Sequence, residues 1–341
     1  MGFPVFHHER FMARLRALPG VEPVVLPVDP GADWVSVSAV DPHPEPPAWA
    51  AGVADERRRA LARAHVLVAL HTPADLRALA PRLHWIQGVG AGMEQFARAV
   101  SSPEGLVVTN ASGTSAGSMA EWVVGRLLQV WKRFREADDF QRGHAFERTY
   151  GRTFAGSTIG IVGLGHIGRA LSRRLRPFDC RILAVKRSAR PGDASDHADE
   201  LFGPDGLHAM LARCDAVVVA APDTPQTRHL IDAAALAAMP RNAVLVNVAR
   251  GTLVDEAALA QAMAGGRLAA AVLDVFDPEP LDPASPLWDL PGVYVSAHSS
   301  VSVDRYADDV FDLVFDNLER YLDGRPLRNE VDTEALGFGA G

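Results

Sequence analysis

Three side chains of complementary chemistry follow three separate apolar runs in the second half of the chain. Arg250 follows "VLVNVA", Glu279 follows "LAAAVLDVF", and His298 follows "GVYVSA". If these runs are parallel strands of one sheet, their carboxyl ends share one edge, and open α/β sheets bind ligands beyond that edge. A histidine or an arginine in such a place is, taken singly, more often structural, so it is their convergence on one edge that favours catalysis.

The three side chains suit the reduction of a 2-keto acid by hydride transfer. A guanidinium binds the substrate carboxylate and polarises the neighbouring carbonyl, which gives Arg250 a binding and a catalytic role. The alkoxide that hydride transfer leaves needs a proton, and the imidazole of His298 is suited to donate one near neutral pH. Glu279 would orient that imidazole and favour its protonated form. Asp274, close to Glu279 in the sequence, suits the carboxamide of a nicotinamide ring.

A glycine-rich loop supplies the expected cofactor site. The stretch "TIGIVGLGHIGRAL" places Gly163, Gly165 and Gly168 directly after an apolar run and at the start of a helical pattern. In a dinucleotide-binding loop the first glycine permits the tight turn, the second admits the pyrophosphate, and the third lets helix and strand pack closely. The N–H groups and positive dipole at the helix start then face the phosphates. A plain strand-to-helix turn is the alternative interpretation.

Basic residues stand where an NAD site would carry an acid. The next apolar run, "CRILAVK", ends in Lys186, and Arg187 and Ser188 follow it. A carboxylate there would bind the ribose hydroxyls of NAD and repel a 2′-phosphate, whereas an ammonium, a guanidinium and a hydroxyl would bind that phosphate. The sequence therefore predicts NADP(H) as the preferred coenzyme and NAD(H) as the second choice. The alternative is a strand that merely has basic flanks at the surface.

Apolar runs of strand length alternate with helical patterns through this half of the chain, which predicts a doubly wound parallel sheet. The predicted strands are 157–163, 180–186, 215–222, 242–249, 268–276 and 292–298. The first half repeats the pattern more weakly, with predicted strands at 22–28, 33–40, 65–71, 84–90 and 105–110. One long helical pattern spans 118–144 and another spans 304–324, and a helix as long as the first usually bridges domains or packs on a second subunit.

Composition sets the class of protein. The chain has 341 residues, of which 48% are hydrophobic and 22% charged, as in soluble globular proteins. A net charge of −8 argues against nucleic-acid or membrane partners. The two cysteines, Cys180 and Cys214, lie beside apolar runs and are expected to be buried free thiols, so no metal site is predicted. The charged N-terminus does not resemble a signal peptide, and the expected location is cytoplasmic.

The ordered blocks "SMAEW", "TIGIVGLGHIG", "PDTPQTRHLID", "NVARGTLVDEAAL", "LDVFDPEPL" and "SPLWDLPGVYVSAH" resemble the D-isomer-specific 2-hydroxyacid dehydrogenases over most of the chain. Within that family the chain looks most like the glyoxylate/hydroxypyruvate reductases that prefer NADPH. The resemblance implies that Arg250, Glu279 and His298 are the catalytic set and that Asp274 lies against the nicotinamide. The chain departs from the family pattern next to His298, at Ala297, Ser299 and Ser300.

The same resemblance implies further contacts and an architecture. The backbone of Val89, Gly90 and Ala91 would bind the substrate carboxylate, together with Arg250 and His298. The remaining expected cofactor contacts are His166, Ile167, Pro222, Thr224, Thr227, Val248 and Ala249. The expected α/β fold has two doubly wound parallel-sheet domains. A Rossmann cofactor domain (113–298) would be inserted in a discontinuous, flavodoxin-like substrate-binding domain (1–112 and 299–341), and the segment after "SMAEW" would build a homodimer.

Two other functions fit the same fold. A nucleotide-sensing binding protein, such as a co-repressor, would not need to retain all three catalytic residues. An NAD-dependent 2-hydroxyacid dehydrogenase is the alternative within the enzyme class, and relatives that oxidise formate or phosphonate with NAD are disfavoured by Lys186 and Arg187.

Overall fold

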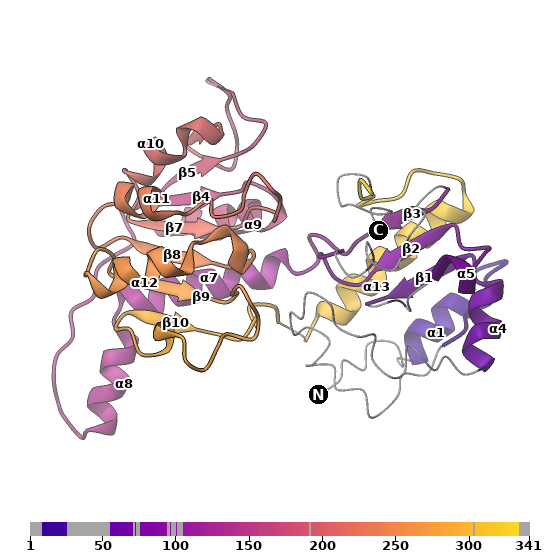
Figure 1. Cartoon of the computed structure of the whole chain (residues 1–341), viewed down its shortest axis with the longest axis horizontal. Coiled ribbons are helices and arrows are strands. Elements are labelled where there is room, and N and C mark those ends of the chain that lie inside the picture. The colour runs from indigo at the N-terminus through magenta and orange to yellow at the C-terminus, as the bar shows by residue number, and fades with distance from the viewer. Residues whose placement is uncertain are drawn as a thin grey trace. The chain divides into compact units, whose positions relative to one another are not determined.

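The computed structural model describes residues 9–25, 55–70, 72, 76–93, 96, 100, 105–190, 192–302 and 304–333. The chain forms two compact units, one made of Met1–Thr114 and Val303–Gly341 and the other of Ser115–Ser302 (Figure 1). Both units are α/β, and each is described below by itself. The predicted domain boundaries, after residues 112 and 298, lie close to the two points, after residues 114 and 302, where the chain passes from one unit to the other.

The larger unit is built on a sheet in which every strand pairing is parallel. Within the described part of the chain this sheet has seven strands in the order β10-β9-β8-β7-β4-β5-β6. The order steps outward in both directions from β4, which is the doubly wound arrangement. The strands are β4 (Thr158–Val162), β5 (Arg181–Val185), β6 (Glu200–Phe202), β7 (Ala216–Val219), β8 (Val244–Asn247), β9 (Ala270–Leu273) and β10 (Val293–Val295).

Helices cover both faces of this sheet, and a separate apolar core lies under each layer (Figure 1). Ile159, Ile161 and Ile182 pack against one layer, whereas Leu183, Val217 and Leu245 pack against the other. Burial on both faces explains why these strands are continuous apolar runs. One layer holds α7 (Ala116–Trp131) and α9 (His166–Leu175), and the other holds α10 (Leu207–Leu211), α11 (Ala233–Ala238) and α12 (Glu256–Ala264).

Two features of the larger unit differ from the prediction. The helical pattern at 118–144 is not one helix, because it breaks into α7 and α8 (Phe134–Arg142) at Arg133, whose φ of 57° is left-handed. Neither glycine nor proline marks that break in the sequence. The edge strand β6 was not predicted, because it begins with Glu200, has no buried residue and lies in no continuous apolar run.

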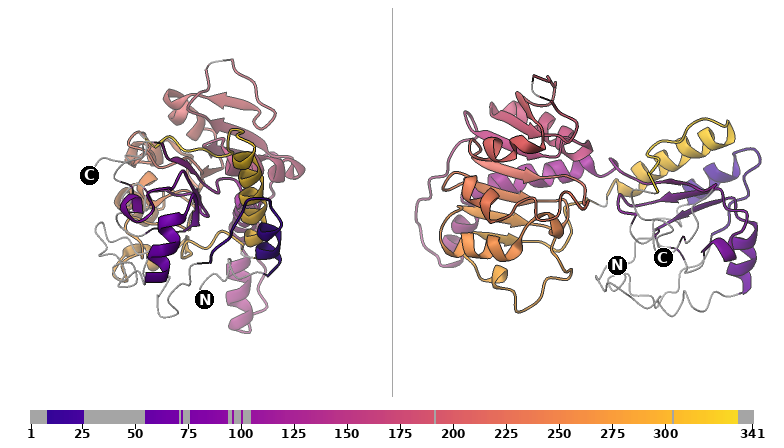
Figure 2. Two further views of the ribbon diagram at one scale, coloured as in Figure 1. Left: turned by 90° about the vertical axis from the view of Figure 1, so that its right-hand side faces the viewer. Right: turned by 45° about the horizontal axis from the view of Figure 1, so that its top comes forward.

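In the smaller unit, the described residues form a parallel three-stranded sheet in the order β1-β2-β3. Phe311 and Phe315 of the C-terminal helix pack with Phe11 against one face of the sheet, along which this helix runs (Figure 2). Leu61 and Leu76 pack on the other face. The elements are α1 (Glu9–Arg16), α4 (Asp55–Arg63), β1 (Val66–Ala69), α5 (Leu76–Leu79), β2 (Trp85–Gly88), β3 (Val107–Thr109) and α13 (Tyr306–Leu322).

The predicted strands at 65–71, 84–90 and 105–110 are confirmed as β1, β2 and β3. The prediction for 22–28 is wrong over residues 22–25, which form no strand, and the prediction for 33–40 lies outside the described residues. The predicted fold class, two doubly wound parallel-sheet α/β domains, is confirmed as two parallel α/β sheets, of which the larger has the doubly wound strand order. Within the described ranges, no helix is long and apolar enough to cross a bilayer.

Candidate active site

Glu279 and His298 form a direct pair. The Nδ1 atom of His298 lies 2.9 Å from Oε2 of Glu279, whose side chain is 19% exposed. The second carboxylate oxygen, Oε1, accepts a hydrogen bond of 3.0 Å from the Phe276 N–H. Because Nδ1 faces the carboxylate, the other ring nitrogen, Nε2, is left to face a ligand, and the His298 side chain is 46% exposed.

Arg250 lies close to this pair. It precedes the short 3-10 helix η3 (Gly251–Leu253) after β8, is partly exposed, and contributes its charge to the electrostatic environment of Glu279. Gly251 holds the two loops together: a Cβ there would lie 1.9 Å from the backbone carbon of Phe276, so only glycine permits this approach. The structure therefore brings together the three residues that the sequence predicted as catalytic.

The ionisation of Glu279 follows from its neighbours. Burial raises its pKa, but the hydrogen bond and charge of His298, the Phe276 N–H and the charge of Arg250 outweigh burial and hold the pKa below the usual range. Glu279 is therefore a carboxylate at neutral pH, and a carboxylate beside Nδ1 favours a ring that carries a proton on that nitrogen.

Asp274 holds the loop that carries His298. It is fully buried, and its carboxylate accepts hydrogen bonds from the Ser296 hydroxyl at 2.7 Å and from the N–H groups of Ser299 and Ser300 at 2.9 and 3.0 Å. The His298 N–H also donates to the Asp274 carbonyl, at 2.8 Å. These contacts fix His298 at a φ of +47°, which non-glycine residues seldom adopt. Asp274 was predicted as a nicotinamide contact, and what its carboxylate does here is position the His298 loop.

A second acid, Glu256, was not predicted from the sequence. It opens α12, and its Oε1 accepts the Asp277 N–H at 2.8 Å, which fixes the segment leading to Glu279. Burial raises the pKa of Glu256; the Asp277 N–H opposes this, and the charges of Asp277 and Glu279 add to it. An acid in the first turn of a helix is common in sequences, so no local signal distinguishes Glu256.

The three glycines of the predicted dinucleotide loop have the geometry that their roles require. Gly163 has a φ of +103°, and a Cβ there would lie 2.6 Å from the Ala221 nitrogen. A Cβ on Gly168 would lie 2.3 Å from the Gly163 carbonyl oxygen, so α9 packs closely on the loop. At Gly165, in contrast, nothing lies within 4 Å of a Cβ, so the protein itself does not require a glycine there. Open space at the second glycine is what a bound pyrophosphate would need.

The start of α9 completes this cradle. Gly165 is the N-cap residue, and no side chain caps the helix, whose first residues are His166 and Ile167. His166 is exposed at the surface, but partial burial of its ring and, to a lesser extent, the charge of Arg169 lower its pKa. An uncapped helix N-terminus favours an anion such as a phosphate.

The predicted phosphate-binding residues lie beside the glycine loop. Val185, the last residue of β5, pairs with Val162, and its carbonyl accepts the Gly163 N–H at 3.0 Å, so Lys186 follows directly alongside the loop. Lys186, Arg187 and Ser188 are all exposed, and within the described residues neither cation forms an ion pair. Arg181, at the opposite end of the same strand, is paired with Glu200 at 2.9 Å.

The other predicted cofactor residues lie in loops after β7 and β8. Pro222 is exposed and Thr224 is partly buried. The Thr227 hydroxyl donates to the Pro222 carbonyl at 2.8 Å and accepts the Thr224 N–H at 2.8 Å. The Thr227 side chain therefore stabilises the loop to which it belongs. Val248 and Ala249 are buried directly after β8, at 2% and 7% exposure.

The predicted substrate loop, Val89–Ala91, belongs to the smaller unit and follows β2. The Val89 N–H donates to the Ala69 carbonyl at 3.1 Å and is not available to a ligand. Gly90 is partly exposed and Ala91 is exposed, which leaves their N–H groups as the candidate donors.

Cys180 and Cys214 are confirmed as buried free thiols. Burial raises the pKa of both, that of Cys214 to about 12. Across the described ranges, no three histidine, cysteine or acidic side chains are grouped as a metal site requires.

The doubly wound sheet with a glycine loop at its central strand defines a Rossmann-type dinucleotide-binding unit. Residues 124–300 match the family model described as "D-isomer specific 2-hydroxyacid dehydrogenase, NAD binding domain". The chain belongs to the D-isomer-specific 2-hydroxyacid dehydrogenase family, as the resemblance of its motifs indicated.

Relatives within this family carry different names. The chain is 33% identical to a glyoxylate reductase of Thermofilum pendens, over 77% of this chain and 79% of that protein. It is 37% identical to the D-3-phosphoglycerate dehydrogenase of Mycobacterium tuberculosis over 71% of this chain, and it spans about half of that relative's length (46%). Among solved structures, it is similar to the NADPH-dependent glyoxylate/hydroxypyruvate reductase of Sinorhizobium meliloti in complex with NADP and sulfate. That match has 30% identity and a TM-score of 0.72 and covers 80% of this chain and 86% of that one.

Proposed function

We propose that the chain is an NADPH-dependent reductase of small 2-keto acids of the glyoxylate or hydroxypyruvate type, with a D-2-hydroxy acid as product. The observation that carries this proposal is the pair formed by Glu279 and His298, 2.9 Å apart, with Arg250 close enough to lower the pKa of the carboxyl. A protein that only sensed a nucleotide would have no use for a proton donor, its orienting acid and a cation for the substrate in one place.

Each residue has one role in the proposed reaction. Arg250 binds the keto acid and polarises its carbonyl, because a guanidinium pairs with both oxygens of a carboxylate and stabilises negative charge at the carbonyl oxygen. His298 donates a proton from Nε2 to that oxygen, and Glu279 keeps Nδ1 protonated and the ring oriented. The N–H groups of Gly90 and Ala91 bind the substrate carboxylate. The bound coenzyme supplies the hydride.

The residues around the glycine loop fit a phosphorylated coenzyme. Gly163, Gly165 and the first turn of α9 hold the pyrophosphate, and Lys186 and Arg187 hold the 2′-phosphate. These two exposed cations form no ion pair with any residue that the structure describes, and they lie beside a loop with open space for a ligand. This supports the assignment over NAD, because a charge-assisted bond to phosphate requires an unpaired cation. Asp274 positions the His298 loop near the nicotinamide end of the site.

The test is a panel of initial rates. NADPH and NADH are each offered with glyoxylate, hydroxypyruvate, pyruvate and phenylpyruvate, and D-3-phosphoglycerate with NADP or NAD probes the oxidation direction. We expect the highest rates with NADPH and the small keto acids. Absence of turnover in the whole panel would refute the proposed function.

A charge exchange tests the coenzyme assignment. Replacing Lys186 by Asp and Arg187 by Ala should raise the KM for NADPH by about 10- to 100-fold, since two charge-assisted contacts are lost, and leave the KM for NADH nearly unchanged. Arg190→Ala, which removes another cation of the same segment, serves as the control. Equal losses with both coenzymes would show that the basic pair does not bind the 2′-phosphate.

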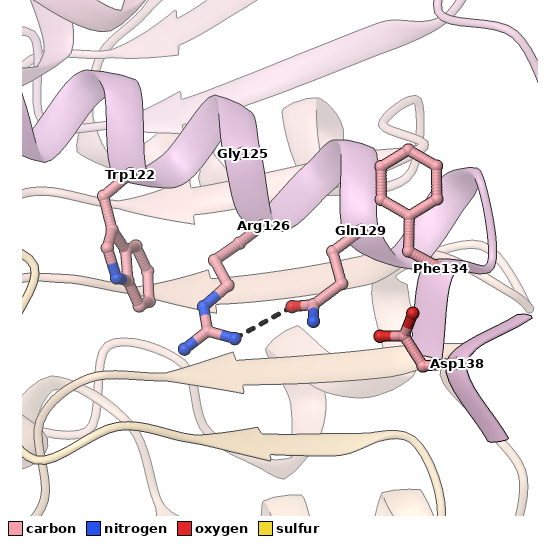
Figure 3. A pocket seen from close by; sticks show the side chains of 6 residues that line it. All are labelled: Trp122, Gly125, Arg126, Gln129, Phe134 and Asp138. Carbon is pink, nitrogen blue, oxygen red and sulfur yellow. Dashed lines mark hydrogen bonds between the residues drawn. The ribbon is translucent and has the colours of Figure 1, made fainter. Parts of the chain in front are cut away.

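We further propose that the protein is a homodimer that uses α7, α8 and the segment after them. No residue of α8 is buried, and Phe146 and Tyr150 are 102% and 75% exposed. A surface pocket between α7 and α8 is lined by Trp122, Arg126 and Phe134, and a hydrogen bond between Arg126 and Gln129 runs along it (Figure 3). Large apolar side chains exposed together on one stretch of chain are a feature of protein–protein interfaces.

Analytical ultracentrifugation tests the dimer. Phe146→Ser combined with Tyr150→Ser should shift the mass from two chains to one. Leu322→Ser, which removes an exposed apolar side chain of α13, should leave the mass unchanged. A monomeric unaltered protein would contradict the proposal.

A further inference from the structure

The segment Val89–Ala91 has three consecutive carbonyl groups, and a different donor holds each of them. The hydroxyl of Tyr306, at the start of α13, donates to the Val89 carbonyl. The Ala111 N–H donates to the Gly90 carbonyl at 2.8 Å, and Nδ2 of Asn110 donates to the Ala91 carbonyl at 2.9 Å. The orientation of three successive peptide groups is therefore fixed by contacts from two other parts of the smaller unit.

Fixed carbonyls determine where the amides point. In a trans peptide the C=O of one residue and the N–H of the next point in opposite directions. With the Val89 and Gly90 carbonyls directed at Tyr306 and Ala111, the N–H groups of Gly90 and Ala91 are directed away from these donors. Within the described residues these two N–H groups donate no hydrogen bond, and both residues reach the surface.

The donors are themselves held in place. Oδ1 of Asn110 accepts the Ser112 N–H at 3.0 Å, which sets the amide so that Nδ2 faces Ala91. Asn317 on α13 donates to the buried Gln87 of β2 at 2.9 Å, which fixes the helix against the strand that leads into the loop. Burial raises the pKa of Tyr306, so its hydroxyl keeps its proton and remains a donor.

We propose that Tyr306 is a positioning residue for the carboxylate of the substrate: by holding the Val89 carbonyl it directs the Gly90 N–H, and with it the Ala91 N–H, toward the ligand. The inference rests on the proposed function for the identity of the ligand, a small 2-keto acid. Tyr306 does not touch the reacting atoms. Its hydroxyl acts through one peptide group, and its ring packs in the core beneath the loop.

Steady-state kinetics on the full-length protein test this role. In Tyr306→Phe the ring stays and the hydroxyl is lost, so the Val89–Gly90 peptide is free to rotate. We expect the KM for glyoxylate to rise by about 3- to 10-fold, the effect of one hydrogen bond, while kcat and the KM for NADPH change less than twofold. Asn110→Ala, which frees the Ala91 carbonyl, should also raise the KM for glyoxylate.

Tyr321→Phe is the matched control. It is the same substitution near the other end of α13, where the hydroxyl lies 3.3 Å from Nδ1 of His84, and it should leave the KM for glyoxylate unchanged. Calorimetric titration of the NADPH-loaded protein with oxamate, a non-reacting carboxylate, should show weaker oxamate binding in Tyr306→Phe and in Asn110→Ala and unchanged binding in Tyr321→Phe.

The outcomes separate the two proposals. An unaltered protein that turns over no keto acid rejects the proposed function. Turnover with an unchanged KM for glyoxylate in Tyr306→Phe rejects only the positioning role. An equal rise of that KM in Tyr321→Phe, or a loss confined to kcat in Tyr306→Phe, rejects it as well.

Discussion

Replacing Glu279 by Gln isolates the charge of the acid that holds His298. The carboxylate accepts two hydrogen bonds, from the Phe276 N–H at 3.0 Å and from Nδ1 of His298 at 2.9 Å. A glutamine has one carbonyl oxygen for these two donors. Because the Phe276 N–H is fixed in the backbone, the amide oxygen is expected to remain there, and the amide NH2 then faces Nδ1.

The imidazole must then present a lone pair at Nδ1, so no carboxylate supports the ring as it gives up a proton from Nε2. A hydrogen bond to a charged group contributes about 1.5–3 kcal/mol, so we expect kcat for glyoxylate reduction to fall by about 10- to 150-fold. Binding of NADPH, followed by fluorescence titration, should be unchanged. Asp289→Asn, which removes one exposed carboxylate from the same unit, is the control.

The assay is the pH dependence of kcat, followed by the absorbance of the reduced nicotinamide. The loss in Glu279→Gln should shrink at acidic pH, because the unaltered protein also loses the carboxylate charge as the pH falls through the lowered pKa of Glu279. A variant with the kcat and pH profile of the unaltered protein would refute the assigned role of the pair.

Glu279 also links stability to pH. Its pKa is lowered in the folded state, so its contribution to stability is present above the ordinary carboxyl pKa and is lost as the pH falls through the lowered value. Glu256 has a raised pKa, so its ionisation lowers stability as the pH rises. Glu256→Gln removes this charge and keeps an acceptor for the Asp277 N–H, so it should raise the thermal midpoint of unfolding at neutral pH. Glu256→Ala removes the acceptor as well and should lower kcat severalfold. Gly251→Ala should destabilise the fold by about 1–3 kcal/mol in urea unfolding, since its Cβ would overlap the Phe276 backbone. Cys180 and Cys214 should not react with a thiol reagent until the protein is unfolded, and rapid labelling of the native protein would contradict their burial.

Six of the seven described strands of the larger unit could be predicted because burial on both faces requires continuous apolar runs. Their carboxyl ends were predictable for the same reason, and this brought Arg250, Glu279 and His298 into one hypothesis. The break at Arg133 could not be predicted, because no glycine or proline marks its left-handed backbone in the sequence.

The contacts that hold the site residues in place could not be predicted from the sequence, for a different reason. Glu256 lies 23 residues before Glu279 in the sequence and acts on it through one backbone N–H, and the Tyr306 hydroxyl reaches a carbonyl that is 217 residues away. Such contacts depend on tertiary packing and leave no periodic pattern. The same holds for Asp274, because the hydrogen bonds that its buried carboxylate accepts from the His298 loop leave no local pattern in the sequence.

A common principle underlies these contacts. The loops after parallel strands carry backbone N–H groups that no longer have a sheet partner, and a buried N–H without an acceptor is costly. In the larger unit carboxylates supply the acceptors: Asp274 binds Ser299 and Ser300, Glu256 binds Asp277, and Glu279 binds Phe276. Because Glu279 accepts from the Phe276 backbone with one oxygen and contacts His298 with the other, the acid that orients the proposed proton donor is itself fixed within its own loop. Substitution of such an acid therefore changes geometry and charge together, and only an isosteric amide, compared with alanine at the same position, separates the two effects.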